Sequence, residues 1–438
     1  MFADLGLVTT AVILFGLLAL LLALGVWIGI ALIIVGFAAI VMVTSVPVGS
    51  VLATTVWASS ASWSLAALPL FIWMGEILFR TRLSEQMFLG LAPWLNWLPG
   101  RLLHVNVVGC GIFAAVSGSS AATCATIGKI ALPELKKRGY DEQMSLGSLA
   151  GSGTLGLLIP PSIPMVVYAI AANVSVIQVF LAGFLPGLLV MGLYSGYILV
   201  WSLLNPRRSP PPEPRTSLWF KLRQSAKLFP VLLLIALIFS ALILGWATAT
   251  ECAAWGVTGA LALAAWSRTL TWNTFIQSVL SATRLTVTIM LILGGAAFTT
   301  AAMAYTGIPA ALAAWVEALH LSPYVLIAAL TVMYIILGCL IDGISMIVLT
   351  TVVVLPMVKQ AGFDLIWFGV FLIILVEMAQ ITPPVGFNLF VLQNMSGRDS
   401  FSVATAALPF FFLLVAAVAI ITAFPDIALF LPRLAFPE

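Results

Sequence analysis

The chain has 438 residues, of which 62% are hydrophobic and 8% are charged, and its formal net charge is +3. Soluble globular domains carry about 25% charged residues, so this composition excludes an ordinary soluble protein. Apolar runs long enough to cross a hydrocarbon core of roughly 30 Å recur from end to end, among them 5–24, 230–246 and 408–424. The sequence therefore predicts an all-α, polytopic protein in a lipid bilayer, since the short alternating segments of a transmembrane barrel are missing.

The residue types that build most enzyme and metal sites are scarce. Four cysteines, Cys110, Cys124, Cys252 and Cys339, lie inside apolar runs without a CxxC or Cys/His cluster. This pattern predicts packing residues instead of metal ligands or disulfides. Only two histidines are present, and neither HExxH nor a GxSG-to-His pairing occurs. We therefore expect no enzyme activity, no organic cofactor and no nucleic-acid partner.

The chain contains two similar units. Residues 1–24 lack the basic region and cleavage site of a signal peptide and are predicted to be a retained N-terminal span. The sequence LPELKKRGYD at 132–141 returns as LPMVKQAGFD at 355–364, and the same offset of 223 residues relates the two Pro-Pro pairs. We therefore divide the rest of the chain into repeat 1 at 25–204, a linker at 205–228, a connecting span at 229–247, and repeat 2 at 248–430.

Basic residues predict how the units are oriented, because short loops rich in Lys and Arg lie in the cytoplasm. The stretch 205–227 (NPRRSPPPEPRTSLWFKLRQSAK) holds six Lys/Arg and many prolines, so we expect an extended cytoplasmic linker. Counting spans in both directions puts 136–138 (KKR) inside and Lys359 outside. The two repeats are therefore predicted to cross the membrane in opposite senses, with both termini on the periplasmic face.

Each repeat contains a segment that is too long for one simple span, at 101–133 and 323–356. Both are interrupted near the middle, by SGSSAAT at 117–123 and by GCLIDGIS at 338–345. Irregular backbone at membrane depth is tolerated where it lines a cavity or is buried in protein. We therefore predict two re-entrant helical hairpins, one from each side, whose tips meet near the middle of the membrane.

A Pro-Pro pair interrupts the next segment of each repeat. The segment 143–172 contains GSGTLGLLIPPS at 151–162, and the segment 366–395 follows QITPPVGFN at 380–388 through its break. Proline removes a backbone donor and frees a carbonyl one turn earlier, and such carbonyls coordinate Na⁺ in the broken helices of transporters. We predict a broken helix beside each hairpin tip, with a simple proline kink as the alternative for either segment taken alone.

Four acidic residues lie at or near membrane depth: Glu76, Glu251, Asp342 and Glu377. Such groups cost at least about 2.5 kcal/mol at the bilayer centre and are usually paired or functional. Asp342 lies at the second predicted tip and is the first candidate for a transport site. Glu377 is expected to support the broken backbone near Pro383, whereas the other two are expected to cap or bridge helices.

Two further segments, 86–97 and 309–320, occupy matching places ahead of the hairpins. Their apolar faces and charged ends predict helices that lie in the membrane interface. We expect them to link a scaffold to the hairpins, as the arms of an elevator-type carrier in which one bundle slides against another.

These patterns resemble the large membrane subunit of TRAP (tripartite ATP-independent periplasmic) transporters, the DctM/SiaM-like proteins of the ion transporter superfamily. The resemblance spans nearly the whole chain. It is carried by five stretches: PLFIWMGEIL (69–78), SGSSAATCATIG (117–128), GTLGLLIPPSIPMVVYA (153–169), TATECAAWG (248–256) and ITPPVGFNLFV (381–391).

The resemblance implies an importer in the bacterial inner membrane that is driven by Na⁺ as the coupling ion. The cargo would be an organic anion, typically a carboxylate such as a C4-dicarboxylate, sialic acid or another sugar acid, or an ectoine-like solute. Two protein partners are implied, a small four-helix membrane subunit and a periplasmic substrate-binding protein. The hairpins and broken helices would move together as an elevator.

The resemblance also implies site residues by motif. Na⁺ ligands would come from two sets, which are Ser117, Gly118, Ser119, Ser120 and Gly153 in repeat 1, and Asp342, Gly343, Ser345, Thr382, Gly386 and Asn388 in repeat 2. Substrate contacts would be Ser119, Ser120, Thr154, Pro161, Ser162, Asp342 and Pro384. Because an acid repels a carboxylate, we expect Asp342 to orient its hairpin or bind Na⁺ instead of touching that group.

Other functions remain open at this stage. A stand-alone Na⁺-coupled carboxylate carrier of the same superfamily would need no binding protein. A channel is a further alternative, although two hairpins with closed tips favour alternating access. An intramembrane enzyme has no motif in its favour.

The predicted orientation is testable at Ser209 in the linker. A cysteine introduced there should resist a membrane-impermeant maleimide added to intact cells and react after permeabilisation, because the linker is expected in the cytoplasm. The wild-type chain, with its four native cysteines, measures the background. Labelling of position 209 in intact cells would contradict the orientation of both repeats.

Overall fold

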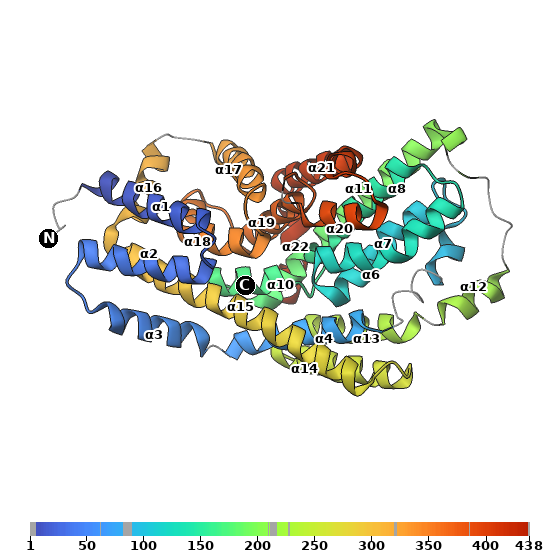
Figure 1. The fold of residues 1–438 in the computed structure, drawn as a ribbon, viewed down its shortest axis with the longest axis horizontal. Coiled ribbons are helices and arrows are strands. Elements are labelled where there is room, and N and C mark those ends of the chain that lie inside the picture. Colours follow the sequence, from blue (N-terminus) through green and yellow to red (C-terminus); the bar gives the residue numbers. More distant parts are fainter. Residues whose placement is uncertain are drawn as a thin grey trace.

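The computed structural model describes residues 6–61, 63–81, 90–208, 210, 217–226, 228–318, 322–384 and 386–436. Throughout these ranges the regular structure is helical, which confirms the predicted all-α fold. The helices form an elongated assembly, with α1 to α3 towards one end and α12 at the other (Figure 1).

The first half of the chain supplies the elements up to the linker. They are α1 (Leu7–Ala23), α2 (Ile28–Val43), α3 (Val48–Ser60), η1 (Trp63–Ala66), α4 (Ala67–Phe79), α6 (Leu102–Ser117), α7 (Ser120–Lys137), α8 (Glu142–Gly153), α9 (Leu155–Leu158), α10 (Ile163–Ala172), α11 (Val176–Leu204) and η2 (Pro206–Arg208).

The second half begins in the linker. Its elements are α12 (Leu218–Ser225), α13 (Phe229–Ile243), α14 (Ala249–Trp266), α15 (Trp272–Thr306), α16 (Ile308–Ala318), α17 (Pro323–Gly338), α18 (Gly343–Gln360), α19 (Leu365–Gln380), α20 (Phe387–Ser396), α21 (Ser400–Ala423) and α22 (Asp426–Ala435).

Several helices have the length and composition of membrane spans. Within the described ranges, four helices meet both criteria: α11, α15, α18 and α21. The number rises to six if two bent pairs each count as one span, namely α8–α9 with α10, bent by 42°, and α12 with α13. Six further apolar helices are shorter: α1, α2, α4, α6, α17 and α19.

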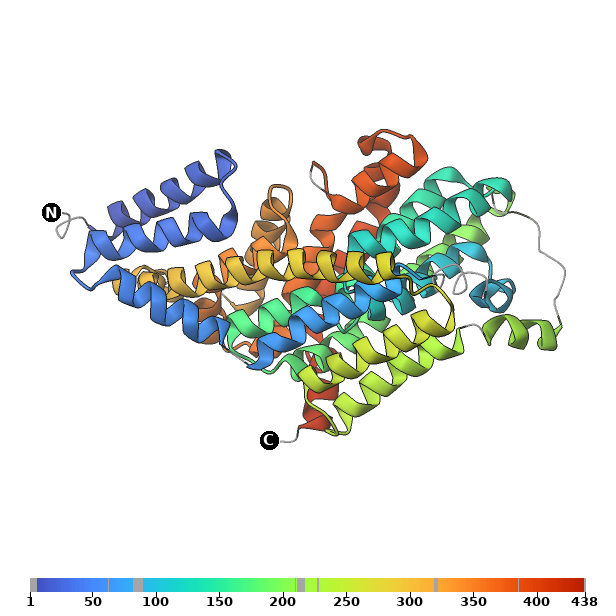
Figure 2. The same cartoon turned by 60° about the horizontal axis from the view of Figure 1, so that its bottom comes forward.

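The longest helix, α15, runs along α2, α3 and α4 (Figure 2). Its backbone approaches α2 closely, because a Cβ added to Gly295 would lie 2.5 Å from the carbonyl oxygen of Gly29. Small residues allow such close helix packing in membrane proteins. Helix α14 packs on α4. We call α2, α3, α4, α14 and α15 the scaffold layer.

Helix boundaries recur at the sequence offset of 223 residues. Helix α7 spans Ser120–Lys137 and α18 spans Gly343–Gln360, so both ends agree with this offset. The next helices begin after matching acidic caps: Asp141 accepts a hydrogen bond from the Met144 N–H at 2.9 Å, and Asp364 accepts one from the Ile366 N–H at 2.6 Å. Such caps satisfy backbone donors that a helix start leaves open, so the repeated Asp explains why both helices start there.

The hairpin helices run past their predicted ends. The segments 101–133 and 323–356 were expected to stop at a proline, but α7 and α18 continue to Lys137 and Gln360. The prolines therefore lie inside the helices. Lysines in the last turns, at 136, 137 and 359, stabilise these ends through the helix dipole.

The linker is only partly extended. Residues 209, 211–216 and 227 lie outside the described part of the chain, but Leu218–Ser225 forms α12, which corrects the expectation of an extended segment. The prolines all precede position 217, and the Ser217 hydroxyl caps the helix by accepting from the Phe220 N–H. Lys221 lies over the Trp94 ring, 5.5 Å from its centroid, and anchors α12.

The predicted interfacial helices are described in part. Residues 86–89 and 319–320 lie outside the described ranges. In the first segment, helical residues continue from position 90 to 95, and in the second, α16 covers Ile308–Ala318.

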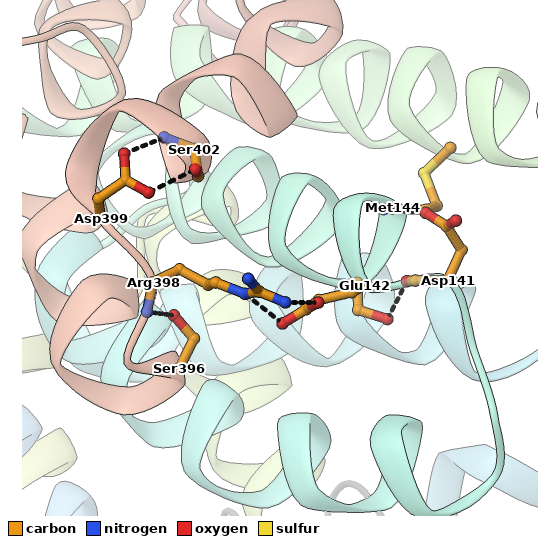
Figure 3. Close-up of polar contacts among 8 residues, drawn as sticks. Asp141, Glu142, Met144, Ser396, Arg398, Asp399 and Ser402 are labelled. Atoms are coloured by element: carbon orange, nitrogen blue, oxygen red, sulfur yellow. Dashed lines mark hydrogen bonds and ion pairs between the residues drawn. The ribbon is translucent and has the colours of Figure 1, made fainter.

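An exposed ion pair joins the two halves of the chain (Figure 3). The Arg398 guanidinium, in the turn between α20 and α21, donates to both oxygens of Glu142 at the start of α8, at 2.9 and 2.5 Å. These hydrogen bonds lower the pKa of Glu142 below its ordinary value. Beside the pair, Asp399 caps α21 by accepting from Ser402.

The Glu142–Arg398 contact should respond to pH and salt. Because the folded-state pKa of Glu142 is lowered, its contribution to stability is full above the unfolded pKa of about 4.3 and is lost as pH falls through the lowered value. Arg398→Gln should therefore lower the thermal unfolding temperature slightly at neutral pH, and the difference should vanish near about pH 3 and in high salt. Arg433→Gln removes an exposed pair within α22 and is the control. A difference that persists in acid would contradict this account.

Candidate functional site

The first hairpin ends in a short turn of small residues. Helix α6 stops at Ser117, and Gly118 takes the left-handed conformation with φ of 57°. This conformation favours glycine. The Ser119 hydroxyl then caps α7 by accepting from the Ala122 N–H at 3.4 Å. The sequence SGSS thus forms the turn, the cap and the first residue of α7.

The second hairpin is capped by a carboxylate. Asp342 precedes α18 and accepts hydrogen bonds from the backbone N–H groups of Ile344 and Ser345, at 3.1 and 3.2 Å. The Ser345 hydroxyl also donates to it. Both carboxylate oxygens are therefore engaged by the start of their own helix. This geometry fits the expectation that Asp342 orients its hairpin.

A cavity of about 290 Å³ lies between the two hairpin tips. Its volume is close to the lower end of the roughly 300–1,000 Å³ usual for small-molecule sites. Its walls come from both tips, from both broken helices and from α15 of the scaffold layer. The lining residues are Gly118, Ser119, Ser120, Ala121, Leu157, Ile163, Pro164, Leu285, Asp342, Gly343, Ile344, Gln380 and Phe387. We call this space the tip cavity.

The walls of the tip cavity are built in matched pairs. Five residues of the first half and five of the second are separated by the same 223 positions and line it together. The pairs are Ser119 with Asp342, Ser120 with Gly343, Ala121 with Ile344, Leu157 with Gln380, and Pro164 with Phe387. The two halves of the chain therefore present equivalent positions to one space.

A second cavity, of about 350 Å³, adjoins the tip cavity and shares three residues with it: Leu285, Asp342 and Ile344. It extends along α15 towards Trp27 and Gly29 at the start of α2. The tip cavity is therefore bordered by the scaffold layer on one side.

Glu377 connects the second broken helix to the first repeat. Its side chain is fully buried, and its two oxygens accept hydrogen bonds from the Ser120 hydroxyl and the Leu157 N–H, each at 2.6 Å. No basic residue of the described chain pairs with it. The expectation that Glu377 supports the backbone near Pro383 is therefore wrong, because its partners lie in the first tip and in α9.

Both broken helices expose carbonyl oxygens at glycines. The peptide bonds between the paired prolines are cis in both repeats. A Cβ added to Gly118 would lie 3.2 Å from the Pro161 oxygen, and one added to Gly386 would lie 2.9 Å from the Gln380 oxygen and 3.0 Å from that of Thr382. Hard oxygens of this kind are the donors that Na⁺ prefers, so the residues present fit a Na⁺ ion at either glycine.

Some of the expected site residues lie elsewhere. The Thr154 hydroxyl donates to the Gly151 oxygen at 2.6 Å and lies 3.0 Å from the Tyr194 hydroxyl, facing α11 and away from the tip cavity. Pro384 is exposed and does not line that cavity. Sequence spacing alone could not show which way these side chains point.

Asn388 and Ser162 lie close to the first repeat's broken helix. Asn388 donates to the Ala150 oxygen at 3.3 Å and borders Gly153, so it groups with the first set of candidate ligands and not with Asp342. Ser162 is buried, and its hydroxyl oxygen has no hydrogen-bond partner in the described structure. An unpartnered buried oxygen next to Pro161 adds to the fit of a cation there.

The remaining acidic residues have structural positions. Glu76 pairs with Arg80 at 3.1 Å, and Arg80 also donates to Ser281 of α15. Glu251 is exposed and forms a capping box with Thr248 at the start of α14. Both observations agree with the predicted bridging and capping roles.

Sequence reasoning missed part of the cavity wall. Ala121, Leu157, Ile163, Pro164, Leu285, Gly343, Ile344, Gln380 and Phe387 were not among the expected substrate contacts. The repeat itself held a usable signal, because the partners of expected residues at the same offset include Gly343. For Leu285 no such signal exists, since α15 has no counterpart in the motifs.

Comparison with known proteins follows from this geometry. Residues 15–427 match the protein-family model described as "Tripartite ATP-independent periplasmic transporter, DctM component". The C4-dicarboxylate TRAP transporter large permease protein DctM of Pseudomonas aeruginosa is 32% identical over 383 residues, covering 87% of this chain and 89% of that protein. The protein of the same name from Rhodobacter capsulatus is 29% identical and covers 97% and 99%.

Two further similarities concern a larger relative and a solved structure. The isethionate TRAP transporter permease protein DctMQ of Oleidesulfovibrio alaskensis is 29% identical over 95% of this chain, but the match covers 66% of that protein. The crystal structure of the YdaH transporter of Alcanivorax borkumensis has a TM-score of 0.63 at 14% identity, covering 86% of this chain and 89% of that one. This second likeness concerns the fold alone.

The buried hydrogen bonds of Glu377 predict a large effect on stability. Glu377→Ala leaves the Ser120 hydroxyl and the Leu157 N–H without an acceptor, and each buried unsatisfied group costs about 1–3 kcal/mol. We expect a clear fall in the thermal unfolding temperature of the detergent-purified protein. Glu377→Gln, which keeps one acceptor, should fall less.

A double-mutant cycle separates this contact from general damage. Combining Glu377→Ala with Ser120→Ala should give a coupling energy of about 0.5–3 kcal/mol. Glu76→Ala, which breaks a half-exposed pair, should have a smaller effect on its own. Additive effects of the two substitutions would show that the Glu377–Ser120 contact does not stabilise the fold.

Proposed function

The chain belongs to the DctM component family of tripartite ATP-independent periplasmic transporters, and from this premise we propose that it is the large permease subunit of a Na⁺-coupled importer. The cargo is an organic anion with a carboxylate group, carried across the bacterial inner membrane. The observation that supports this proposal most directly is the tip cavity, whose walls come in matched pairs from the two halves of the chain. Transporters built from repeats bind their cargo at such an interface.

The proposed Na⁺ sites lie beside the two tips. The first would use oxygens around Gly118, with Pro161, Ser162 and Asn388 as the neighbours that support it. The second would use the Gln380 and Thr382 carbonyl oxygens at Gly386. A bound Na⁺ supplies positive charge next to a cavity whose described lining has no basic residue. The anion and the cation would therefore favour each other's binding.

The elevator mechanism is also a proposal. The scaffold layer would stay fixed while the hairpins and broken helices move with the cargo between them. The adjoining cavity along α15 and α2 supports a boundary at this place. Opposite membrane orientations of the two repeats would make the outward and inward states similar, and the recurring helix boundaries of α7 and α18 are consistent with this symmetry.

We propose two partners, a small membrane subunit and a periplasmic substrate-binding protein. The family's description as tripartite supports both. The larger DctMQ relative extends beyond the match by about a third of its length, and we propose that the corresponding function is supplied here by a separate chain. The termini would lie on the periplasmic side.

Substitutions at the tips should abolish transport without loss of the protein. Asp342→Ala removes the cap of α18, and Ser119→Ala removes the cap of α7, so the tips lose the geometry that positions cargo and Na⁺. We expect Na⁺-driven uptake into proteoliposomes to fall at least about tenfold for each, as expected for loss of groups that position substrate, with wild-type amounts of purified protein. Uptake at the wild-type rate in either variant would refute the site.

The same assay distinguishes the tripartite importer from a stand-alone carrier. Vesicles that contain the membrane proteins should take up cargo only when the binding protein is supplied outside. Ser217→Ala, which alters the cap of α12 far from the tips, should transport at the wild-type rate. Uptake without any binding protein would favour the stand-alone carrier.

A further inference from the structure

Gln380 is a polar side chain in the wall of the tip cavity that the proposed mechanism does not use. It is the last residue of α19 and is only 7% exposed. Within the described residues its amide has no hydrogen-bond partner. A buried amide normally finds partners, because leaving it unpaired is unfavourable. The position of Gln380 therefore leaves its amide free for a group inside the cavity.

The counterpart of Gln380 in the first half is apolar. Leu157 lies 223 residues earlier and lines the same cavity from the opposite repeat. The cavity thus has one apolar and one polar wall at equivalent positions. Because the backbone framework of the two halves is alike, this difference assigns hydrogen bonding at this level to the second half.

The two helix starts at the cavity also differ in charge. The start of α18 is already occupied by the Asp342 carboxylate, which accepts from two backbone N–H groups. The start of α7 is capped by the neutral Ser119 hydroxyl alone. Helix starts attract anions, so a carboxylate of the cargo is favoured on the α7 side. A second carboxylate on the Gln380 side would be repelled by Asp342.

We propose that Gln380 binds a neutral polar group of the cargo and makes the tip cavity selective for hydroxylated monocarboxylates over dicarboxylates. This inference rests on the proposed transport function, because it assumes that the tip cavity receives the cargo. The carboxylate lies towards Ser119 and Ser120, and a hydroxyl group at the other end exchanges hydrogen bonds with the Gln380 amide. The amide both donates and accepts, which suits a hydroxyl group.

Binding to the full-length chain tests the proposal without requiring transport. The protein is purified in detergent in Na⁺ buffer, and its thermal unfolding temperature is measured against rising concentrations of three probes. The probes are gluconate, hexanoate, which has the same chain length without hydroxyls, and succinate. A ligand that binds the folded state raises this temperature in proportion to its affinity, so the titrations rank the probes.

The expected result is specific to one probe and one position. Wild-type protein should bind gluconate more tightly than hexanoate or succinate. Gln380→Leu, which copies the opposite wall, should weaken gluconate binding about tenfold, as expected for one lost hydrogen bond, and leave hexanoate binding unchanged. Gln178→Leu makes the same change in α11, outside the tip cavity, and should keep the wild-type order.

Leu157→Gln completes the comparison, because it adds an amide to the other wall. It should keep the preference for gluconate that Gln380→Leu loses. Equal weakening of all three probes in Gln380→Leu would show a packing role and overturn the proposal. Wild-type protein that prefers succinate, or that gluconate fails to stabilise, would overturn it as well.

Failure of this inference is distinct from failure of the proposed function. If Na⁺-driven uptake is absent but gluconate binding depends on Gln380, the importer proposal fails and the role of Gln380 stands. If uptake is present and binding ignores Gln380, the reverse holds.

Discussion

The structure around the tip cavity depends on one buried carboxylate. Glu377 lies on α19 of the second half, yet both of its hydrogen bonds go to the first half, at Ser120 and Leu157. Without a basic partner, the charge is balanced by these donors and by whatever cation lies near. A buried acid is tolerated only when its hydrogen bonds are complete, so this contact fixes how α19, α7 and α9 meet. The cavity between them takes its shape from that constraint.

The two tips solve the same problem in different ways. Each hairpin must begin a helix inside the protein, where backbone N–H groups need acceptors. The first uses the Ser119 hydroxyl and the second uses the Asp342 carboxylate. The choice of cap sets the local charge as well as the geometry, because only the second cap carries a negative charge. Structural support and recognition of the cargo are therefore linked in the same residues.

Much of the architecture is predictable from the sequence, because prolines, glycines and caps act locally. The hairpin breaks at 117–123 and 338–345 contain the observed turns, and both Pro-Pro pairs interrupt helices as expected. The ends of α7 and α18 were placed too early, since a proline within a helix removes only one donor when the following residues favour helix. The opposite orientation of the repeats and the Na⁺ ligands are still predictions. Contacts across the halves, such as those of Glu377 and Asn388, depend on packing that no local pattern encodes.

The paired walls of the tip cavity also bear on how such a protein diversifies. Each wall position occurs twice in the gene, so one copy can preserve the framework while the other accumulates changes that alter the cargo. Leu157 and Gln380 already differ in this way. A lineage can therefore acquire a new nutrient specificity through a single codon in one half, with the ancestral residue retained opposite. Mutational scans of this family should find tolerance unevenly shared between the two members of each pair.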